Sequence, residues 1–84
     1  MPKQWGNRMK ITYKKLWKLL IDREMMKKDL LEASKISTVS MAKLGKDQNV
    51  TTDVLLKICT ALHCDISDIM QVVENDDFKN EDHS

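Results

Sequence analysis

The sequence predicts an all-α fold, a compact domain of five short helices. Gly and Pro are scarce, with two Gly and one Pro in 84 residues, whereas strand-rich small domains need more of these residues in their turns. Apolar residues recur instead at the three- and four-residue spacing of amphipathic helices. The segments between these repeats are only a few residues long. Helices this short must pack against one another to be stable, which indicates a single compact unit.

The first two helices are predicted from apolar stripes in a lysine-rich part of the chain. Thr12 is suited to be the N-cap of the first helix. The apolar stripe of this helix consists of Tyr13, Leu16, Trp17, Leu20 and Ile21. The second helix runs from about Lys27 to Ser34, and its apolar residues are Leu30 and Leu31.

The third and fourth helices each follow a hydroxyl residue that is suited to capping. Ser37 precedes the third helix, in which Met41 and Leu44 share one face. Thr51 precedes the fourth helix. Four of its residues have the spacing of a buried stripe: Leu55, Ile58, Cys59 and Leu62.

The fifth helix is predicted to open at Asp65. Asp68 follows three residues later, in the spacing of a capping box. The helix then continues through Ile69, Val72 and Val73. Around these five helices we expect a basic N-terminal arm or extension at residues 1–10, a folded domain at residues 11–74, and an acidic flexible tail at residues 75–84.

The net charge of +1 conceals a strong asymmetry along the chain. Residues 1–46 carry twelve basic and four acidic side chains, whereas residues 47–84 carry two basic and nine acidic side chains. The front half is therefore suited to a polyanion, and the back half is expected to face away from it.

Several function classes are excluded by what the sequence lacks. It has no apolar run of the roughly 20 residues that span a bilayer, and no apolar stretch typical of a signal peptide. Cys59 and Cys64 cannot form a disulfide framework, so we expect reduced thiols in a cytoplasmic protein. Together with His63 they provide only three clustered ligands, so we expect no metal and no cofactor. No nucleophile is suitably spaced from a histidine, and we expect no enzyme activity.

The second and third helices form the most informative pair. Two helices of seven to nine residues joined by a tight turn are typical of a helix-turn-helix, whose second helix enters the DNA major groove. The apolar residues of the third helix face inward. Its other face presents five residues without a large apolar side chain: Thr38, Val39, Ala42, Lys43 and Lys46. This face is suited to phosphates and base edges.

From Ile11 to Val73 the sequence resembles the Cro/C1-type, or Xre, family of helix-turn-helix transcriptional regulators. The segments that carry the resemblance are Lys27-Lys28-Asp29-Leu30, Ile36-Ser37-Thr38-Val39-Ser40-Met41-Ala42-Lys43-Leu44, Val50 to Cys59, and Ala61 to Met70. The resemblance implies a lambda-repressor-like domain that binds double-stranded DNA. Three residues depart from the family pattern. Lys35 stands where the turn commonly has glycine, Leu31 stands where the second helix usually has a small residue, and Met26 stands where a capping Ser or Thr is typical.

The resemblance also implies roles for individual residues. Thr38, Val39 and Lys43 match positions whose side chains reach base edges, and Lys27 matches a residue that holds a phosphate. Lysine can donate to guanine, and Val39 can pack on a thymine methyl. The chemistry of the remaining candidates for the DNA backbone fits phosphate binding. These candidates are Lys28, Ser37 and Lys46.

Family members commonly form dimers through the end that carries the fifth helix, so we expect a homodimer on a palindromic operator. The candidate interface residues are Ile66, Ile69, Met70 and Val73. Our preferred interpretation is a sequence-specific regulator, a repressor that acts by occupying its operator, with no small-molecule ligand. Two alternatives remain: a protein-interaction module of the same fold that has lost specific DNA binding, and a thiol or metal sensor that uses Cys59 and Cys64.

Overall fold

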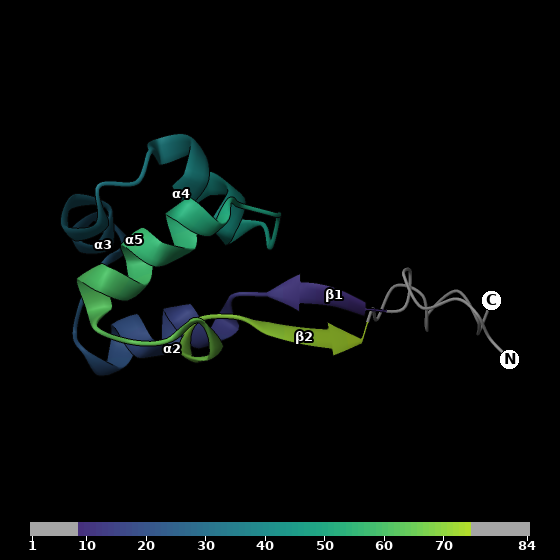
Figure 1. The fold of residues 1–84 in the computed structure, drawn as a ribbon. Coiled ribbons are helices and arrows are strands. Elements are labelled where there is room, and N and C mark those ends of the chain that lie inside the picture. The colour runs from purple at the N-terminus through teal and green to yellow at the C-terminus, as the bar shows by residue number, and fades with distance from the viewer. Residues whose placement is uncertain (1–8, 75–84) are drawn as a thin grey trace, which may run out of the picture.

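The computed structural model describes residues 9–74 of the chain. In chain order its elements are β1 (Met9–Thr12), α2 (Lys14–Asp22), α3 (Lys27–Ser34), α4 (Thr38–Gly45), α5 (Thr52–Leu62), the 3-10 helix η1 (Ile66–Asp68) and β2 (Gln71–Glu74) (Figure 1). The predicted acidic tail and the first eight residues of the predicted arm lie outside the described residues.

The helices form one body, and the two strands form a ribbon that projects from it (Figure 1). Strands β1 and β2 are antiparallel, with Met9 opposite Glu74 and Thr12 opposite Gln71. We call this two-stranded sheet the ribbon. The first and last described residues therefore lie side by side, at the tip of the ribbon.

The core lies among the four helices and η1. Its ten buried apolar residues are Tyr13, Leu16, Leu20, Leu30, Ile36, Leu44, Leu55, Ile58, Leu62 and Ile69. Each of the four α-helices contributes at least one residue, and those of α2 and α5 have the three- and four-residue spacing that the sequence predicts. Burial of these side chains holds together helices that are individually too short to be stable.

The predicted second, third and fourth helices are confirmed as α3, α4 and α5. Their caps explain where two of them begin. The Ser37 hydroxyl accepts a hydrogen bond from the backbone N–H of Ser40 at 3.1 Å. The Thr51 hydroxyl accepts one from the backbone N–H of Val54 at 3.3 Å. Both bonds satisfy donors that the first turn of a helix leaves unpaired.

The prediction of five helices in an all-α fold is wrong at the C-terminal end of the domain. The capping box at Asp65 forms, since the Asp65 N–H donates to Asp68 Oδ2 at 2.9 Å. It opens only the single turn of η1, however, because the chain then becomes extended in β2. Val72 and Val73 are β-branched and favour strands, and β1 supplies a partner for them.

The predicted start of the first helix is also wrong. Thr12 ends β1, and α2 begins at Lys14. The Thr12 hydroxyl still accepts a hydrogen bond from the backbone N–H of Lys14, at 3.3 Å. The strand begins at Met9, so it crosses the predicted boundary between arm and domain.

Tyr13 connects the start of α2 to the loop that follows α4. Its side chain is 1% exposed, and its hydroxyl donates to the Gln48 carbonyl at 2.9 Å. Its backbone N–H donates to Asp47 Oδ1 at 3.0 Å. Asp47 itself has a positive φ of 57°, a conformation that Asp tolerates better than most residues.

The turn between α3 and α4 contains a left-handed residue that is not glycine. Lys35 has φ 63° and ψ 24°, and its N–H donates to the Leu31 carbonyl. Glycine adopts this conformation without the steric cost that a β-carbon brings. Glycine would therefore be the favoured residue at this turn position.

Replacing Lys35 by glycine should therefore stabilise the fold. We expect Lys35→Gly to raise the free energy of unfolding by about 1 kcal/mol, because relief of backbone strain exceeds the added entropy of the unfolded chain. Urea denaturation followed by circular dichroism measures the change. Lys46→Gly is the matched control, because Lys46 caps α4 with a φ of −108° and no strain to relieve. Equal shifts in both variants would contradict the argument.

Candidate nucleic-acid interface

Helices α3 and α4 are held against each other by side chains that flank the turn. Leu30 in α3 and Leu44 in α4 are fully buried, and Ile36 in the turn is 6% exposed. The buried Ser34 hydroxyl donates to the Leu30 carbonyl at 2.7 Å, so it leaves no polar group unpaired. Leu30, Ile36 and Leu44 belong to one buried cluster, so α3 and α4 are both anchored in the core, and the opposite side of α4 is open to solvent.

The residues predicted to read bases lie on that open side. Thr38, Val39 and Lys43 are exposed, and 64% of Val39 is accessible, so its methyl groups can be contacted from outside. Lys46, predicted to contact the DNA backbone, is exposed just beyond α4. The methyl groups of Val39 and the ammonium groups of Lys43 and Lys46 are therefore all carried by α4 and the residue that follows it.

Ser37 lies at the N-terminus of α4 and is exposed, but its hydroxyl is engaged within the protein. It accepts from the Ser40 N–H and lies 3.1 Å from the Ser40 hydroxyl. The N-terminus of a helix carries partial positive charge from its unpaired N–H groups, so it can attract an anion without the side chain.

The two lysines that open α3 are exposed as well. The Lys27 ammonium lies 4.5 Å from the centroid of the Trp17 ring. Met26 cannot cap the helix as Ser or Thr would, but Asp29 compensates, since its Oδ2 accepts from the Met26 N–H at 2.8 Å. Lys28 follows Lys27 directly, so two cationic side chains project near the start of the helix.

Of the four candidate dimer residues, Ile69 was placed wrongly. It is fully buried in the core, because the chain turns inward after η1, and it cannot belong to a surface. Ile66 is 37% exposed, and Met70 and Val73 are partly buried. Val72, predicted to lie in a helix, is 58% exposed on β2, and the helical pattern does not reveal it as a surface residue.

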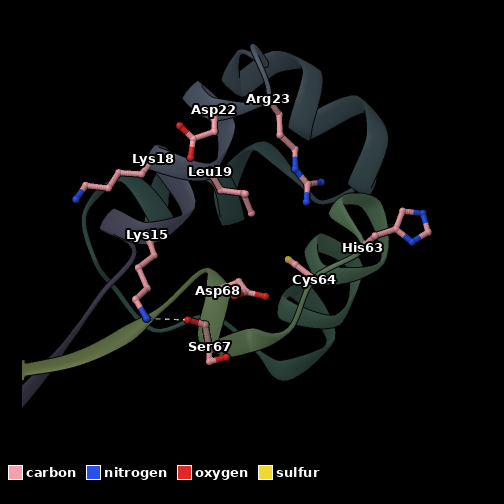
Figure 2. Close-up of a pocket in the computed structure, with 9 residues that line it drawn as sticks. All are labelled: Lys15, Lys18, Leu19, Asp22, Arg23, His63, Cys64, Ser67 and Asp68. Carbon is pink, nitrogen blue, oxygen red and sulfur yellow. Dashed lines mark hydrogen bonds between the residues drawn. The ribbon is translucent and has the colours of Figure 1, made fainter.

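A hollow of about 440 Å³ lies away from α4, between α2, the end of α5 and η1 (Figure 2). Lys15 crosses its rim and donates to the Ser67 carbonyl at 2.9 Å, and Arg23 donates to the Leu62 carbonyl. Asp22 and Asp68 bring opposite charge to the same walls. None of the predicted DNA-contacting residues lines this hollow.

The two cysteines meet where α5 ends. The helix stops at His63, which is left-handed, and the Cys64 N–H donates back to the Cys59 carbonyl at 3.1 Å. Burial raises the pKa of both thiols, that of Cys64 to about 11. Thiols with raised pKa values are poor nucleophiles at neutral pH. In the described part of the chain, no group of three or more His, Cys, Asp or Glu side chains is arranged to hold a metal.

The raised pKa values predict slow alkylation of both cysteines by iodoacetamide at pH 7. The rate should rise about tenfold per pH unit and level off for Cys64 only near pH 11, because the thiolate is the reacting form. Mass spectrometry of timed samples measures the rate at each residue. The urea-unfolded chain is the control and should level off near pH 8.5. A folded protein that follows the same curve would contradict the assignment.

No helix among residues 9–74 is both long and apolar enough to cross a membrane.

A protein-family model, described as Cro/C1-type HTH DNA-binding domain, matches residues 15–75 of the chain. A solved structure, described as the crystal structure of transcriptional regulator VanUg, Form II, is similar to this chain with 45% sequence identity and a TM-score of 0.79, and the match covers 89% of this chain and all of that one. Among curated proteins there is no match. The chain belongs to the family of Cro/C1-type helix-turn-helix DNA-binding domains.

Proposed function

We propose that this protein is a sequence-specific transcriptional regulator that represses by occupying an operator in double-stranded DNA. The observation that carries the proposal is the exposed face of α4, where Thr38, Val39 and Lys43 lie together on a helix of the family that binds DNA. Similarity to a transcriptional regulator over the whole of that protein's length also supports it. Selection of bound duplexes from a random pool tests binding and sequence preference together.

The exposed side chains of α4 are suited to recognise two kinds of base, one through hydrogen bonds and one through apolar contact. The Lys43 ammonium can donate to O6 and N7 of guanine in the major groove, and the Val39 methyl groups can pack on the methyl group of thymine. Thr38 can either donate or accept, so it discriminates weakly. We assign most of the sequence preference to Lys43 and Val39.

Around this helix, four residues are proposed to bind the DNA backbone. Such contacts fix the orientation of the protein on the duplex but carry no sequence information. They are Lys27, Lys28, Ser37 and Lys46. For Ser37 the contact would come from the N-terminus of α4, because its hydroxyl already bonds to Ser40.

We further propose a homodimer on a palindromic operator, because one chain with a single reading helix can cover only one half-site. The ribbon supplies a suitable surface. Residues opposite each other in an antiparallel pair point to the same face, so Met9, Ile11, Val72 and Glu74 share one side, which is apolar except at its tip. Met9 and Val72 are 48% and 58% exposed, an apolar surface that an isolated two-stranded sheet leaves uncovered.

The open edge of β2 suits the same partner. Among residues 9–74 no third strand lies beside it, so a strand of a second copy could pair along this edge. Pairing of β2 with its symmetry mate would extend the ribbon to four antiparallel strands. Val73 lies in this strand and Met70 directly before it, so two of the four residues predicted for the interface border the proposed contact.

Removal of the Lys43 side chain should weaken DNA binding and broaden its sequence preference. For Lys43→Ala we expect a loss of about 1–3 kcal/mol of binding free energy on the selected duplex, and a smaller loss on a duplex changed at the contacted base. Fluorescence anisotropy with labelled duplexes measures both. Lys57→Ala is the matched control, because Lys57 lies on α5 in an exposed ion pair with Asp53 at 3.2 Å.

Two results would count against the proposal. Unchanged affinity and preference in Lys43→Ala would show that the reading face is wrongly assigned. If no duplex binds even at low salt, where phosphate contacts are strongest, the protein-interaction module becomes the better interpretation.

The proposed interface predicts that Val72→Glu shifts the protein to a monomer. A carboxylate at position 72 would be buried at the centre of this face in the dimer, on the same side as Glu74, so both desolvation and like-charge repulsion would oppose pairing. Sedimentation velocity at micromolar concentration measures the change. Leu56→Glu is the matched control, because Leu56 is 60% exposed on α5, away from the ribbon. A monomeric wild type, or dissociation by Leu56→Glu but not by Val72→Glu, would rule out this interface.

A further inference from the structure

Trp17 joins the helical core to the start of α3. It lies on α2, partly buried, and packs against the buried cluster. From the sequence it is one of the apolar residues of its helix. In the structure its ring also faces the first residue of α3, because the Lys27 ammonium lies 4.5 Å from the ring centroid.

This distance is typical of a cation–π contact, in which the electron-rich face of the ring attracts the ammonium. Lysine has a flexible four-carbon stem, and a free lysine loses much rotamer freedom when it binds a fixed anion. The Trp17 ring is fixed because its helix packs in the core through Leu16 and Leu20. The contact therefore restricts Lys27 before any ligand arrives.

The contact leaves Lys27 able to bind an anion. The ammonium has three N–H donors, and the ring covers one side of the group. Lys27 is exposed, so the other side is open to solvent. An ammonium held in this way can donate to a phosphate oxygen without leaving the ring.

We propose that Trp17 is a positioning residue for DNA: its ring holds the Lys27 ammonium in the orientation that binds a backbone phosphate. The proposal rests on the proposed function, since it assigns a role to Trp17 through the phosphate contact of Lys27. Backbone contacts set the register of the protein on the duplex. Trp17 thereby links the packing of α2 to the placement of α4 in the groove.

The geometry can be tested without DNA. A tryptophan ring shifts the resonances of protons above its face upfield, so the ε-methylene protons of Lys27 should resonate upfield of those of Lys28 in the free full-length chain. Trp17→Leu should remove the difference, and Trp17→Phe should reduce it. Thermal unfolding of each variant reports whether the fold is retained. Equal shifts for Lys27 and Lys28 in the wild type would overturn the proposal.

A double-mutant cycle on the selected duplex tests the role in binding. We expect Trp17→Phe to weaken binding about two- to threefold and Trp17→Leu about three- to fivefold, the range of a cation–π contact at an exposed site. In a Lys27→Ala background both changes should have no effect. In the control background Lys28→Ala they should have their full effect, because Lys28 does not depend on the ring.

Salt dependence separates positioning from the loss of a contact. Lys27→Ala should lower the slope of log affinity against log salt concentration by about one, whereas Trp17→Phe should leave it unchanged, because the phosphate contact remains. An equal loss of affinity for Trp17→Phe with and without Lys27 would show a merely structural role. Stronger binding by Trp17→Phe would show that the ring sequesters Lys27. Either result overturns the proposal, and failure of the wild type to bind any duplex would instead overturn the proposed function.

Discussion

The buried side chain of Tyr13 is the contact on which the arrangement of the domain depends. Tyr13 lies between the end of β1 and the start of α2. It binds the loop after α4 through both its hydroxyl and its backbone N–H. Its ring is part of the core. One residue thus fixes three parts of the molecule relative to one another: the ribbon, the first helix and the end of the reading helix. A buried hydroxyl requires a hydrogen-bond partner, and the Gln48 carbonyl supplies it.

The basic and acidic halves of the sequence form different elements of the fold. The helix pair that carries Lys27, Lys28 and Lys43 belongs to the basic half, whereas η1 and β2 belong to the acidic half. A phosphate backbone would attract the former and repel the latter. The near-zero net charge is therefore the sum of a basic part that DNA attracts and an acidic part that DNA repels. These charges favour an orientation in which α3 and α4 face the DNA and η1 and β2 point away from it.

What could be predicted from the sequence is what local interactions determine. The limits of α3, α4 and α5 follow from Ser37, Thr51 and the spacing of buried leucines, all within one or two turns of each helix. The exposed side of α4 follows from the same spacing. Strand β2 was missed because a Val-Val pair suits a helix end or a strand, and its partner is far away in the sequence. The contact of Lys27 with Trp17 was missed for a similar reason, since it joins side chains of two different helices.

The pairing of β1 with β2 has a consequence for how the domain assembles. Even the strand residues nearest in sequence, Thr12 and Gln71, are separated by about 60 positions, so their pairing must close a loop that contains every helix. The entropy of closing such a loop is recovered only after the helices have condensed and brought the two ends together. The ribbon therefore forms after the helical core and opens before it. We therefore expect the strands to open locally without unfolding of α3 and α4, and a partner that captures the strands would act on this less stable part of the fold.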